Sequence, residues 1–522
     1  MQFDRRTLVK SMGSLALFAG IESRAVFAQT LAGYPFTLGI ASGDPHPDGF
    51  VLWTRLAPKP FDPGSGMPMK SVPVRWEVAE DARFARILQS GEALARPELG
   101  HSVHVEVKGL HPARLYHYRF LTGDHASPVG AVRAAPAAGA VVDRLRIGVA
   151  GCQHYENGYF TAYRHMSEEP DLDAVFHYGD YIYEHWAGRQ CPKAGDGERN
   201  CFRTHHGDEI YSLDDYRRRY AQYKMDPDLQ AAHAAVAFLP SWDDHEIDNN
   251  WAAQYDEQGT PPELFLMRRY AAMQAWYENM PVRRAQFPAN GGLHMHRRLD
   301  YGRLLRIHLL DTRQHRTDQR CAPRKTNDCR PVSDGRPSQM LGAAQENWLK
   351  GGMRADFGWN LLAQQVMMMP FRYLESRAEG RENLDSWSGY PDARARIVDT
   401  ILEKKLTNVI VATGDVHKHH AGVVPARENE WEGPAVATEY VASSISTGGD
   451  GSDIPKGWEN VLSENPQTSL LNDQRGYQLF TIGKKEWRTD VIGVEKVTAP
   501  GGERRKIATL VTVPRQPGVH RL

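Results

Sequence analysis

Short runs of alternating hydrophobic and polar residues fill the first part of the chain after a leader segment. Glycine, proline and aspartate separate these runs, which are Phe50–Arg55, Val72–Val78, His104–Lys108 and Tyr116–Phe120. Alternation with a period of two is typical of strands that bury one face, and such short spacing favours a β-sandwich. The pattern therefore predicts a small N-terminal β-sandwich domain over residues 34–136.

From Arg146 onward the apolar runs alternate with longer amphipathic stretches. The apolar runs are Arg146–Ala150, Ala174–Tyr178, Leu304–Leu310, Leu361–Met367 and Asn408–Thr413. Helical periodicity marks Ser212–Gln222 and Gln345–Arg354, and Tyr477–Ile482 with Glu486–Lys496 predict terminal strands. Uniformly apolar strands that alternate with helices are typical of a layered α/β architecture. We expect it over residues 141–522, with an extended C-terminus that lacks a covering helix.

The first residues have the pattern of an export signal. Arg5 and Arg6 precede a mostly apolar stretch over 12–21, and Val26-Phe27-Ala28 follows, with small side chains where signal peptidase needs them. The paired arginines favour twin-arginine export; the alternative is an ordinary secretory signal in which the pair occurs by chance. We expect the twin-arginine translocation machinery and signal peptidase to process residues 1–28, which predicts a periplasmic or secreted protein.

Composition and charge narrow the classes of partner. The 522 residues carry 63 basic and 64 acidic side chains, a formal net charge of −1, so the basic excess typical of a nucleic-acid-binding module is missing. Beyond the leader, no stretch reaches the roughly 18 apolar residues that a membrane span needs. We therefore expect no nucleic-acid-binding module and no stable membrane anchor.

Four of the five cysteines bracket two short polar loops. Cys191 and Cys201 flank one loop, and Cys321 and Cys329 flank the other. In an oxidising compartment this spacing predicts two short-range disulfides, with four unpaired thiols as the alternative. Cys152 is left over, and a free cysteine in an exported protein is either buried as a small apolar residue or used chemically.

Several predicted strands end at polar clusters. The clusters are Gly151-Cys152, Gly179-Asp180 with Tyr183, Asp243-Asp244-His245-Glu246, Asp311-Thr312-Arg313 and Gly414-Asp415 with His417. In open α/β sheets, ligands gather outside the carboxyl ends of the strands, so we expect these endings to converge on one edge. A glycine precedes several of these residues and would let the backbone turn sharply.

The residue types suit a two-metal centre better than a serine triad, because carboxylates, a histidine, a tyrosine and a thiolate are all metal ligands. Two cations held by a shared carboxylate clamp a phosphoryl group and lower the pKa of a water. Each cluster also has a simpler interpretation. Gly-Asp is a common turn, Asp-Asp-His-Glu is compatible with a solvated helix start, and Asp-x-His is compatible with a turn.

The ordered motifs resemble those of calcineurin-like metallophosphoesterases and, more closely, of the PhoD-type alkaline phosphatase/phosphodiesterase family. The matching stretches are Gly39–Pro45, Val51–Arg55, Gly151–Gln153, His177–Glu184, Asp215–Arg217, Trp242–Glu246 with Asn249-Asn250, Leu310–Arg313, Gln364-Gln365 and Thr413–His417. This resemblance implies an α/β (α+β) fold: a fibronectin- or immunoglobulin-like β-sandwich, then a four-layer αββα metallophosphoesterase sandwich.

The resemblance also implies Fe(3+) and Ca(2+) as cofactors. The iron ligands would be Cys152, Asp180, Tyr183 and His417. Asp180 would bridge the two cations, and Asp244 and Asp415 would complete the calcium side. Thiolate and phenolate are strong donors for ferric iron, and carboxylates suit calcium. His245 is the expected catalytic general acid. Asn249 and Tyr155, with the neighbouring His154, are weaker candidates for phosphate contact.

The function that we expect is hydrolysis of phosphate monoesters and diesters by attack of a metal-bound hydroxide, with small phosphate esters as substrates. An alternative with the same metals is a phospholipase D-like phosphodiesterase that acts on lipid headgroups. A non-enzymatic alternative is an exported metal- or carbohydrate-binding module. The β-sandwich alone allows that alternative, but the clusters in the rest of the chain disfavour it.

Overall fold

The structure is a computed structural model that describes residues 31, 33–189, 191, 201–289, 291–319, 337–373, 382–428, 430–455 and 457–522. The expected signal segment 1–28 and the expected Cys321–Cys329 pair lie outside these residues. The expected Cys191–Cys201 disulfide is present, and Cys152 is free and buried. No helix in the described ranges is long and apolar enough to span a membrane.

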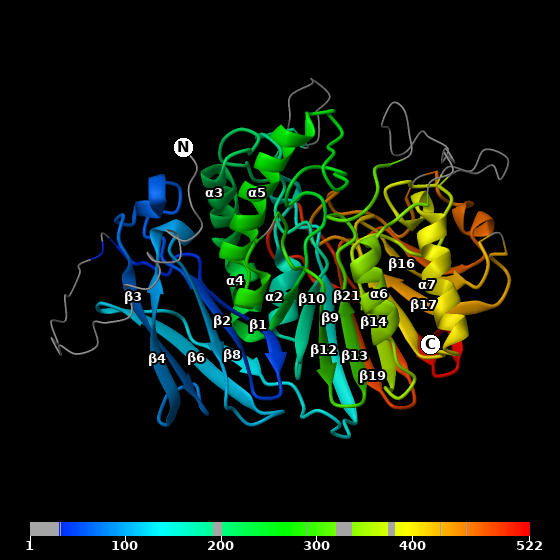
Figure 1. Cartoon of the computed structure of the whole chain (residues 1–522), viewed down its shortest axis with the longest axis horizontal. Helices are drawn as coiled ribbons and strands as arrows, with labels where there is room; N and C mark the ends of the chain where they lie inside the picture. Colours follow the sequence, from blue (N-terminus) through cyan, green and yellow to red (C-terminus); the bar gives the residue numbers. More distant parts are fainter. Residues whose placement is uncertain are drawn as a thin grey trace, which may run out of the picture.

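The strands form three sheets (Figure 1). The largest has ten strands, in the spatial order β22(Gln516–Arg521), β21(Arg504–Val513), β20(Trp487–Val494), β19(Gly476–Gly483), β9(Arg144–Ala150), β10(Ala174–His177), β11(Phe238–Pro240), β1(Ile40–His46), β2(Gly49–Arg55) and β5(Ser102–Val107). The second has seven, in the order β12(Arg297–Tyr301), β13(Leu305–Leu309), β14(Trp359–Ala363), β15(Val409–Thr413), β17(Ala435–Val441), β16(His419–Pro425) and β18(Thr468–Asn472). The third runs β4(Ile87–Ala95), β3(Val72–Ala79), β6(Leu115–Thr122) and β7(His125–Ala126), and β8(Gly130–Arg133) also pairs with β6.

The helices cover the outer faces of the two larger sheets. Apolar residues of α2(Thr161–Ser167), α3(Leu213–Lys224), α4(Pro227–Ala235) and α5(Pro262–Asn279) share a core with the ten-stranded sheet. Those of α6(Gly342–Gly352) and α7(Pro391–Glu403) share one with the seven-stranded sheet. Short 3-10 turns are η1(Pro63–Gly66), η2(Pro97–Leu99), η3(Tyr155–Asn157), η4(Arg284–Gln286), η5(Trp387–Gly389) and η6(Val461–Glu464).

A third core lies between the two large sheets, which pack face to face. It joins Phe176 and Leu239 of the ten-stranded sheet to Leu305, Leu361 and Ile410 of the seven-stranded sheet, and all five side chains are fully buried. Helices, sheet, sheet and helices therefore form four layers, and the expected αββα sandwich is confirmed.

The N-terminal β-sandwich shares a sheet with the rest of the molecule. Its five-stranded sheet packs on β1, β2 and β5 through a common apolar core. However, β1 also pairs in parallel with β11, with Gly43 opposite Phe238. The three strands therefore extend the ten-stranded sheet, which the sequence pattern did not predict because strand pairing between residues so far apart leaves no local signal.

Most predicted elements appear with their ends shifted by a few residues. Helix α3, for example, starts at a capping box in which Ser212 Oγ accepts the Asp215 N–H and the Asp215 carboxylate accepts the Ser212 N–H. The run Leu361–Met367 is not one strand, because β14 ends at Ala363. Gln365 instead turns inward and donates to Ser241 Oγ at 2.6 Å and to the Leu310 carbonyl at 2.8 Å.

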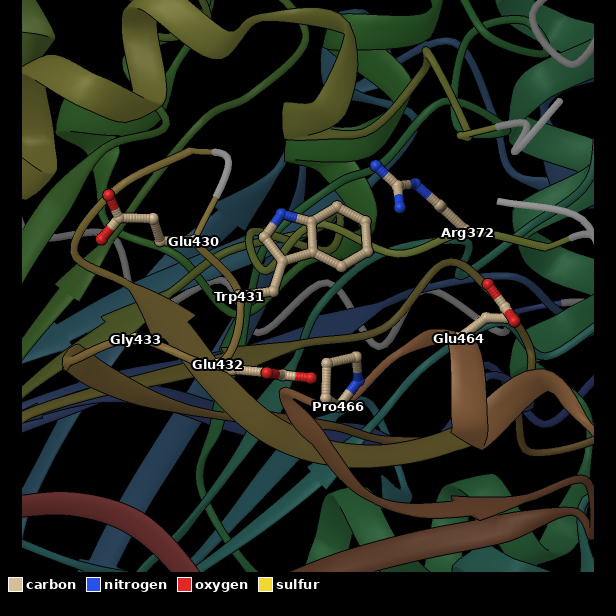
Figure 2. Close-up of a pocket in the computed structure, with 7 residues that line it drawn as sticks. All are labelled: Arg372, Glu430, Trp431, Glu432, Gly433, Glu464 and Pro466. Carbon is tan, nitrogen blue, oxygen red and sulfur yellow. The ribbon is translucent and has the colours of Figure 1, made fainter. Parts of the chain in front are cut away.

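One pocket of about 510 Å³ lies where the β16–β17 hairpin meets the segment before β18 (Figure 2). The Arg372 guanidinium lies over the Trp431 ring, 4.2 Å from its centroid, and the side chains of Glu430, Glu432 and Glu464 surround them. Its lining contains none of the predicted ligands, so this pocket is separate from the clusters at the strand ends.

A buried carboxylate joins the loop after β14 to β17. Glu439 accepts N–H groups from Met368 at 2.8 Å and Met369 at 2.5 Å, and the hydroxyl of Thr413 at 2.9 Å. Burial raises the pKa of Glu439 to about 7 despite these hydrogen bonds. The carboxylic acid form is therefore favoured in the folded protein below that pH.

We predict that Glu439 makes stability fall as pH rises. Below pH 4.5 the side chain is protonated in both states; between pH 4.5 and about 7 only the unfolded chain ionises, which favours unfolding. The free energy of unfolding of the wild type should lose about 3 kcal/mol relative to Glu439→Gln across this window. Denaturant titrations at pH 4.5 and pH 8 measure the difference, and an equal gap at both pH values would contradict it.

Candidate metal centre

Five strand endings carry the candidate residues, and they come from two sheets. Strands β9, β10 and β11 belong to the ten-stranded sheet, whereas β13 and β15 belong to the seven-stranded sheet. The expectation of a single edge is therefore corrected: the site forms where the carboxyl ends of two facing sheets meet. The residues that follow these strands contact one another across that junction, as Arg313 does Asp243 and Tyr183 does His417.

The ligand residues themselves, rather than only the glycines beside them, adopt left-handed backbone conformations at the sharp turns. Cys152, Asp180, Asp415 and His417 have φ angles of 49°, 53°, 68° and 56°, a region that non-glycine residues rarely occupy. The glycines beside them mainly allow close packing. A Cβ on Gly414, for example, would lie 2.0 Å from a ring carbon of Tyr178. Such strained backbone is concentrated at functional sites, where the surrounding fold maintains it.

Asp180 is the centre of the first group of side chains. Its Oδ2 accepts the Tyr183 hydroxyl at 2.9 Å and the Cys152 thiol at 3.2 Å. The Tyr183 oxygen lies 3.4 Å from His417 Nε2 and 2.9 Å from Thr447 Oγ1. The structure thus brings the four predicted iron ligands together, and it adds Thr447, which no strand-end motif indicated.

Burial sets the protonation of this group. Burial, with the nearby Asp180 carboxylate, raises the pKa of the Cys152 thiol and of the Tyr183 phenol well above their usual values. Burial also lowers the pKa of His417 well below its usual value, which leaves a neutral imidazole with a free lone pair. Because thiol and phenol groups ligate a cation in their deprotonated forms, a cation bound here would displace these protons.

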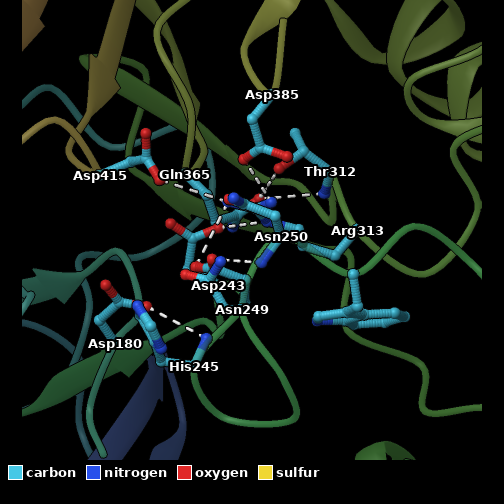
Figure 3. A network of polar contacts seen from close by, with 12 residues as sticks. Asp180, Asp243, His245, Asn249, Asn250, Thr312, Arg313, Gln365, Asp385 and Asp415 are labelled. Atoms are coloured by element: carbon cyan, nitrogen blue, oxygen red, sulfur yellow. Dashed lines mark hydrogen bonds and ion pairs between the residues drawn. The ribbon is translucent and has the colours of Figure 1, made fainter. Parts of the chain in front are cut away.

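A second group of carboxylates surrounds Arg313 (Figure 3). The buried guanidinium lies 2.5 Å from Asp243 Oδ1 and 2.5 Å from Asp385 Oδ2. Its Nη2 lies 3.4 Å from Asp244 Oδ1 and 3.3 Å from Asp415 Oδ1. The predicted calcium-side ligands are therefore joined through an arginine. Its position after β13 was visible in the sequence, but its role was not.

His245 lies between the two groups. Its backbone N–H faces Asp180 Oδ1 at 3.4 Å, and its Nδ1 lies 2.7 Å from Glu184 Oε2. Burial opposes its protonation, but Glu184, Asp244 and Asp180 outweigh burial and raise the pKa of His245 well above its usual value. The imidazolium form, which a general acid needs, is therefore favoured.

Sets of side chains that could hold a cation occur in the described residues. One set is Cys152, Asp180 and His417, and another is Asp180, Asp244 and His245; within each set the donor atoms lie within 4.8 Å of one another. Cys152, Asp180 and His417 therefore fit one cation. His245, whose ring favours the protonated form, is not counted as a ligand, but Asp244 lies within the same spacing of Asp180 and allows a second cation there.

The two weaker phosphate candidates have other contacts. The Asn249 amide donates to Glu257 Oε2 at 2.7 Å. The Tyr155 ring lies under the Arg203 guanidinium, 4.0 Å from its centroid. Their contact with phosphate stays a prediction.

Two further histidines, His419 and His420, stand at the start of β16, and both are fully buried. His419 Nδ1 accepts the Ser443 N–H at 3.1 Å, so this side chain supports the chain next to β17.

The fold defines the class of protein. The structure of the purple acid phosphatase PPD1 from yellow lupin (Lupinus luteus) seeds aligns with a TM-score of 0.51 at 14% identity, covering 88% of this chain and 72% of that chain. At this identity the likeness shows the fold alone, a metallophosphoesterase-like fold.

The chain belongs to the PhoD-like phosphatase family. The family model matches residues 147–491, and the model of its N-terminal domain matches residues 22–136. Alkaline phosphatase D of Bacillus subtilis (strain 168) is 42% identical over 533 residues, 100% of this chain and 89% of that protein. A solved structure of PhoD aligns with a TM-score of 0.89, covering 94% of this chain and 92% of that chain. The protein is therefore a phosphoric ester hydrolase.

We predict that Arg313→Gln destabilises the metal-free protein by about 3–5 kcal/mol, because several buried carboxylates lose their counter-charge. Arg313→Lys should lose less, because it keeps the charge but not the forked geometry. Denaturant unfolding of chelator-treated protein measures both effects. Equal stability of Arg313→Gln and wild type would contradict this account of the cluster.

Proposed function

We propose that the protein hydrolyses phosphate monoesters and diesters with an iron(III) and calcium pair. The observation that supports this pair is the convergence of a thiol and a phenol on the Asp180 carboxylate, with the His417 imidazole beside the phenol. Thiolate and phenolate donors suit ferric iron, and the Asp244 and Asp415 carboxylates suit calcium. When bound, the cations neutralise the phosphate and lower the pKa of the attacking water.

The proposed ligands divide between the two sides of Asp180. Cys152, Tyr183 and His417 hold iron with Asp180, and Asp244 and Asp415 hold calcium with it. Asp243 and Asp385 are both 2.5 Å from Arg313 and so stabilise the guanidinium rather than a cation. The donors therefore separate by type, with sulfur and phenolate on one side and only carboxylates on the other.

His245 acts in this proposal as the general acid. The Glu184 carboxylate, which is not one of the proposed ligands, lies 2.7 Å from Nδ1 and favours a proton on the ring, and the adjacent Asp180 and Asp244 place the ring at the edge of the cation cluster. Donation of this proton to the departing oxygen of the ester neutralises the alkoxide as the bond to phosphorus breaks. Esters with poor leaving groups gain most from this step.

We predict that Asp180→Asn abolishes both cation loading and hydrolysis, because one residue bridges the two sides. Purified wild type should contain iron and calcium and show a visible absorption band from a tyrosinate–iron bond, whereas the variant should lose all three signals. Emission spectroscopy, absorption spectra and release from p-nitrophenyl phosphate measure these outcomes. Full activity of Asp180→Asn would refute the proposed centre.

The range of esters is tested by comparing p-nitrophenyl phosphate, bis(p-nitrophenyl) phosphate and a phospholipid. We expect turnover of p-nitrophenyl phosphate and bis(p-nitrophenyl) phosphate. Preference for the phospholipid would favour lipid headgroups as the natural substrate class, and hydrolysis of the monoester alone would remove diesters from the proposal.

Export by the twin-arginine route to the periplasm or the medium is also part of the proposal, supported by Arg5, Arg6 and the apolar stretch behind them. Replacement of both arginines by lysine should leave the protein inside the cytoplasm with its leader attached. Cell fractionation and the mass of the purified chain measure this, and unchanged export would exclude the twin-arginine route.

A further inference from the structure

The carboxylate of Glu184 lies against the proposed proton donor. Glu184 follows Tyr183 in the loop after β10, whereas His245 lies in the loop after β11. Glu184 Oε2 lies 2.7 Å from His245 Nδ1, and the side chains are 0% and 8% exposed. At this distance and depth, the contact is a strong charge-assisted hydrogen bond.

We propose that Glu184 is a positioning residue for the reaction: it binds Nδ1 of His245 and so directs Nε2 to the leaving oxygen of the ester. The inference rests on the proposed role of His245 as general acid. A carboxylate that orients a histidine through one ring nitrogen leaves the other nitrogen to exchange the proton, as in other acid–base pairs.

Glu184 is itself fixed on its other side. Its Oε1 accepts the backbone N–H of Asn249 at 3.0 Å, so the carboxylate spans the loops after β10 and β11. His185 Nδ1 also lies 3.2 Å from Oε1. That nitrogen lies 2.8 Å from Arg189 Nη1, which can only donate, so it accepts from Arg189 and does not compete with His245 for Glu184.

The imidazole of His245 is held on its faces and edges as well. The Tyr183 ring packs on it with centroids 4.1 Å apart, and the His185 ring meets it edge-on at 5.2 Å. Figure 3 shows His245 beside Asp180 at the lower end of the network. With Nδ1 bound to Glu184 and Tyr183 against one face, rotation of the ring would break both contacts.

Glu257 provides a matched control for a change at Glu184. Both glutamates use both carboxylate oxygens as acceptors, and both bind Asn249: Glu184 binds its backbone N–H, and Glu257 binds its side-chain amide. The second oxygen of Glu257 accepts the Asn250 amide at 2.7 Å. No hydrogen bond links Glu257 to His245, so the same Glu→Gln change there should not alter proton donation.

The test compares kcat/KM for phosphate monoesters whose leaving groups differ in pKa, from p-nitrophenyl to alkyl. Glutamine has one acceptor oxygen where Glu184 uses two, so Glu184→Gln should misalign His245. We expect a loss of about 10–100-fold for alkyl esters and under about 3-fold for p-nitrophenyl phosphate, because only poor leaving groups need the proton. Glu184→Asp keeps the charge but moves it away from His245. It should therefore also lose more kcat/KM for alkyl esters than for p-nitrophenyl phosphate.

Further variants separate positioning from general damage. Glu257→Gln should change every ester by the same factor, and Glu184→Gln should keep the cation content and visible spectrum of the wild type. In the His245→Asn background, Glu184→Gln should add no further dependence on the leaving group, because the two residues act as a unit.

The possible failures are distinguishable. Suppose that kcat/KM of both Glu184 variants depends on the leaving-group pKa as in the wild type, while His245→Asn makes that dependence steeper. Glu184 is then not a positioning residue, and the role of His245 stands. If His245→Asn also leaves the dependence of kcat/KM on the leaving-group pKa unchanged, His245 is not the general acid, and Glu184 has no proton donor to position. Loss of cations from Glu184→Gln with an equal rate loss for all esters would assign Glu184 a structural role instead.

Discussion

The site depends on the burial of several acidic groups at the junction of two sheets. Asp180 stands at the centre of this constraint, because its carboxylate contacts a thiol and a phenol and its backbone N–H donates to Glu246. Buried like charges repel strongly in a poorly polarisable interior, so they require counter-charge or a proton. Arg313 and the protonated ring of His245 supply positive charge within the chain, and bound cations would add to it.

The same constraint explains the role of Glu246, the last residue of the Asp-Asp-His-Glu sequence. Its carboxylate accepts N–H groups from Asp180 at 3.1 Å, Tyr181 at 2.6 Å and Asp243 at 2.8 Å. It thus ties the loop after β10 to the loop after β11. The loops that carry the ligands are fixed by buried carboxylate-to-backbone bonds, which is how the strained φ angles of Asp180 and its neighbours are maintained.

The sequence predicted the parts of this site that leave a local signal. Buried strands read as apolar runs, and the ligands follow them within a few residues, so Cys152, Asp180 and Asp415 could be placed from their neighbours alone. The cluster of ion pairs around Arg313 could not be predicted in this way, because its partners Asp243 and Asp385 are about 70 residues away in either direction. The shared sheet of the N-terminal strands was missed for the same reason. The Gln364-Gln365 turn was mistaken for strand because its apolar neighbours continue the run.

The ligand set also constrains when the centre can assemble. Cys152, Tyr183 and His417 come from loops of two different sheets, and they meet only once those sheets pack face to face. In addition, the Cys152 thiol is fully buried and its raised pKa opposes ionisation until a cation is present, so cation capture and loss of the thiol proton are linked. Cation loading therefore accompanies or follows folding, and the proposed twin-arginine route, which carries folded proteins, would allow the complete centre to form before export.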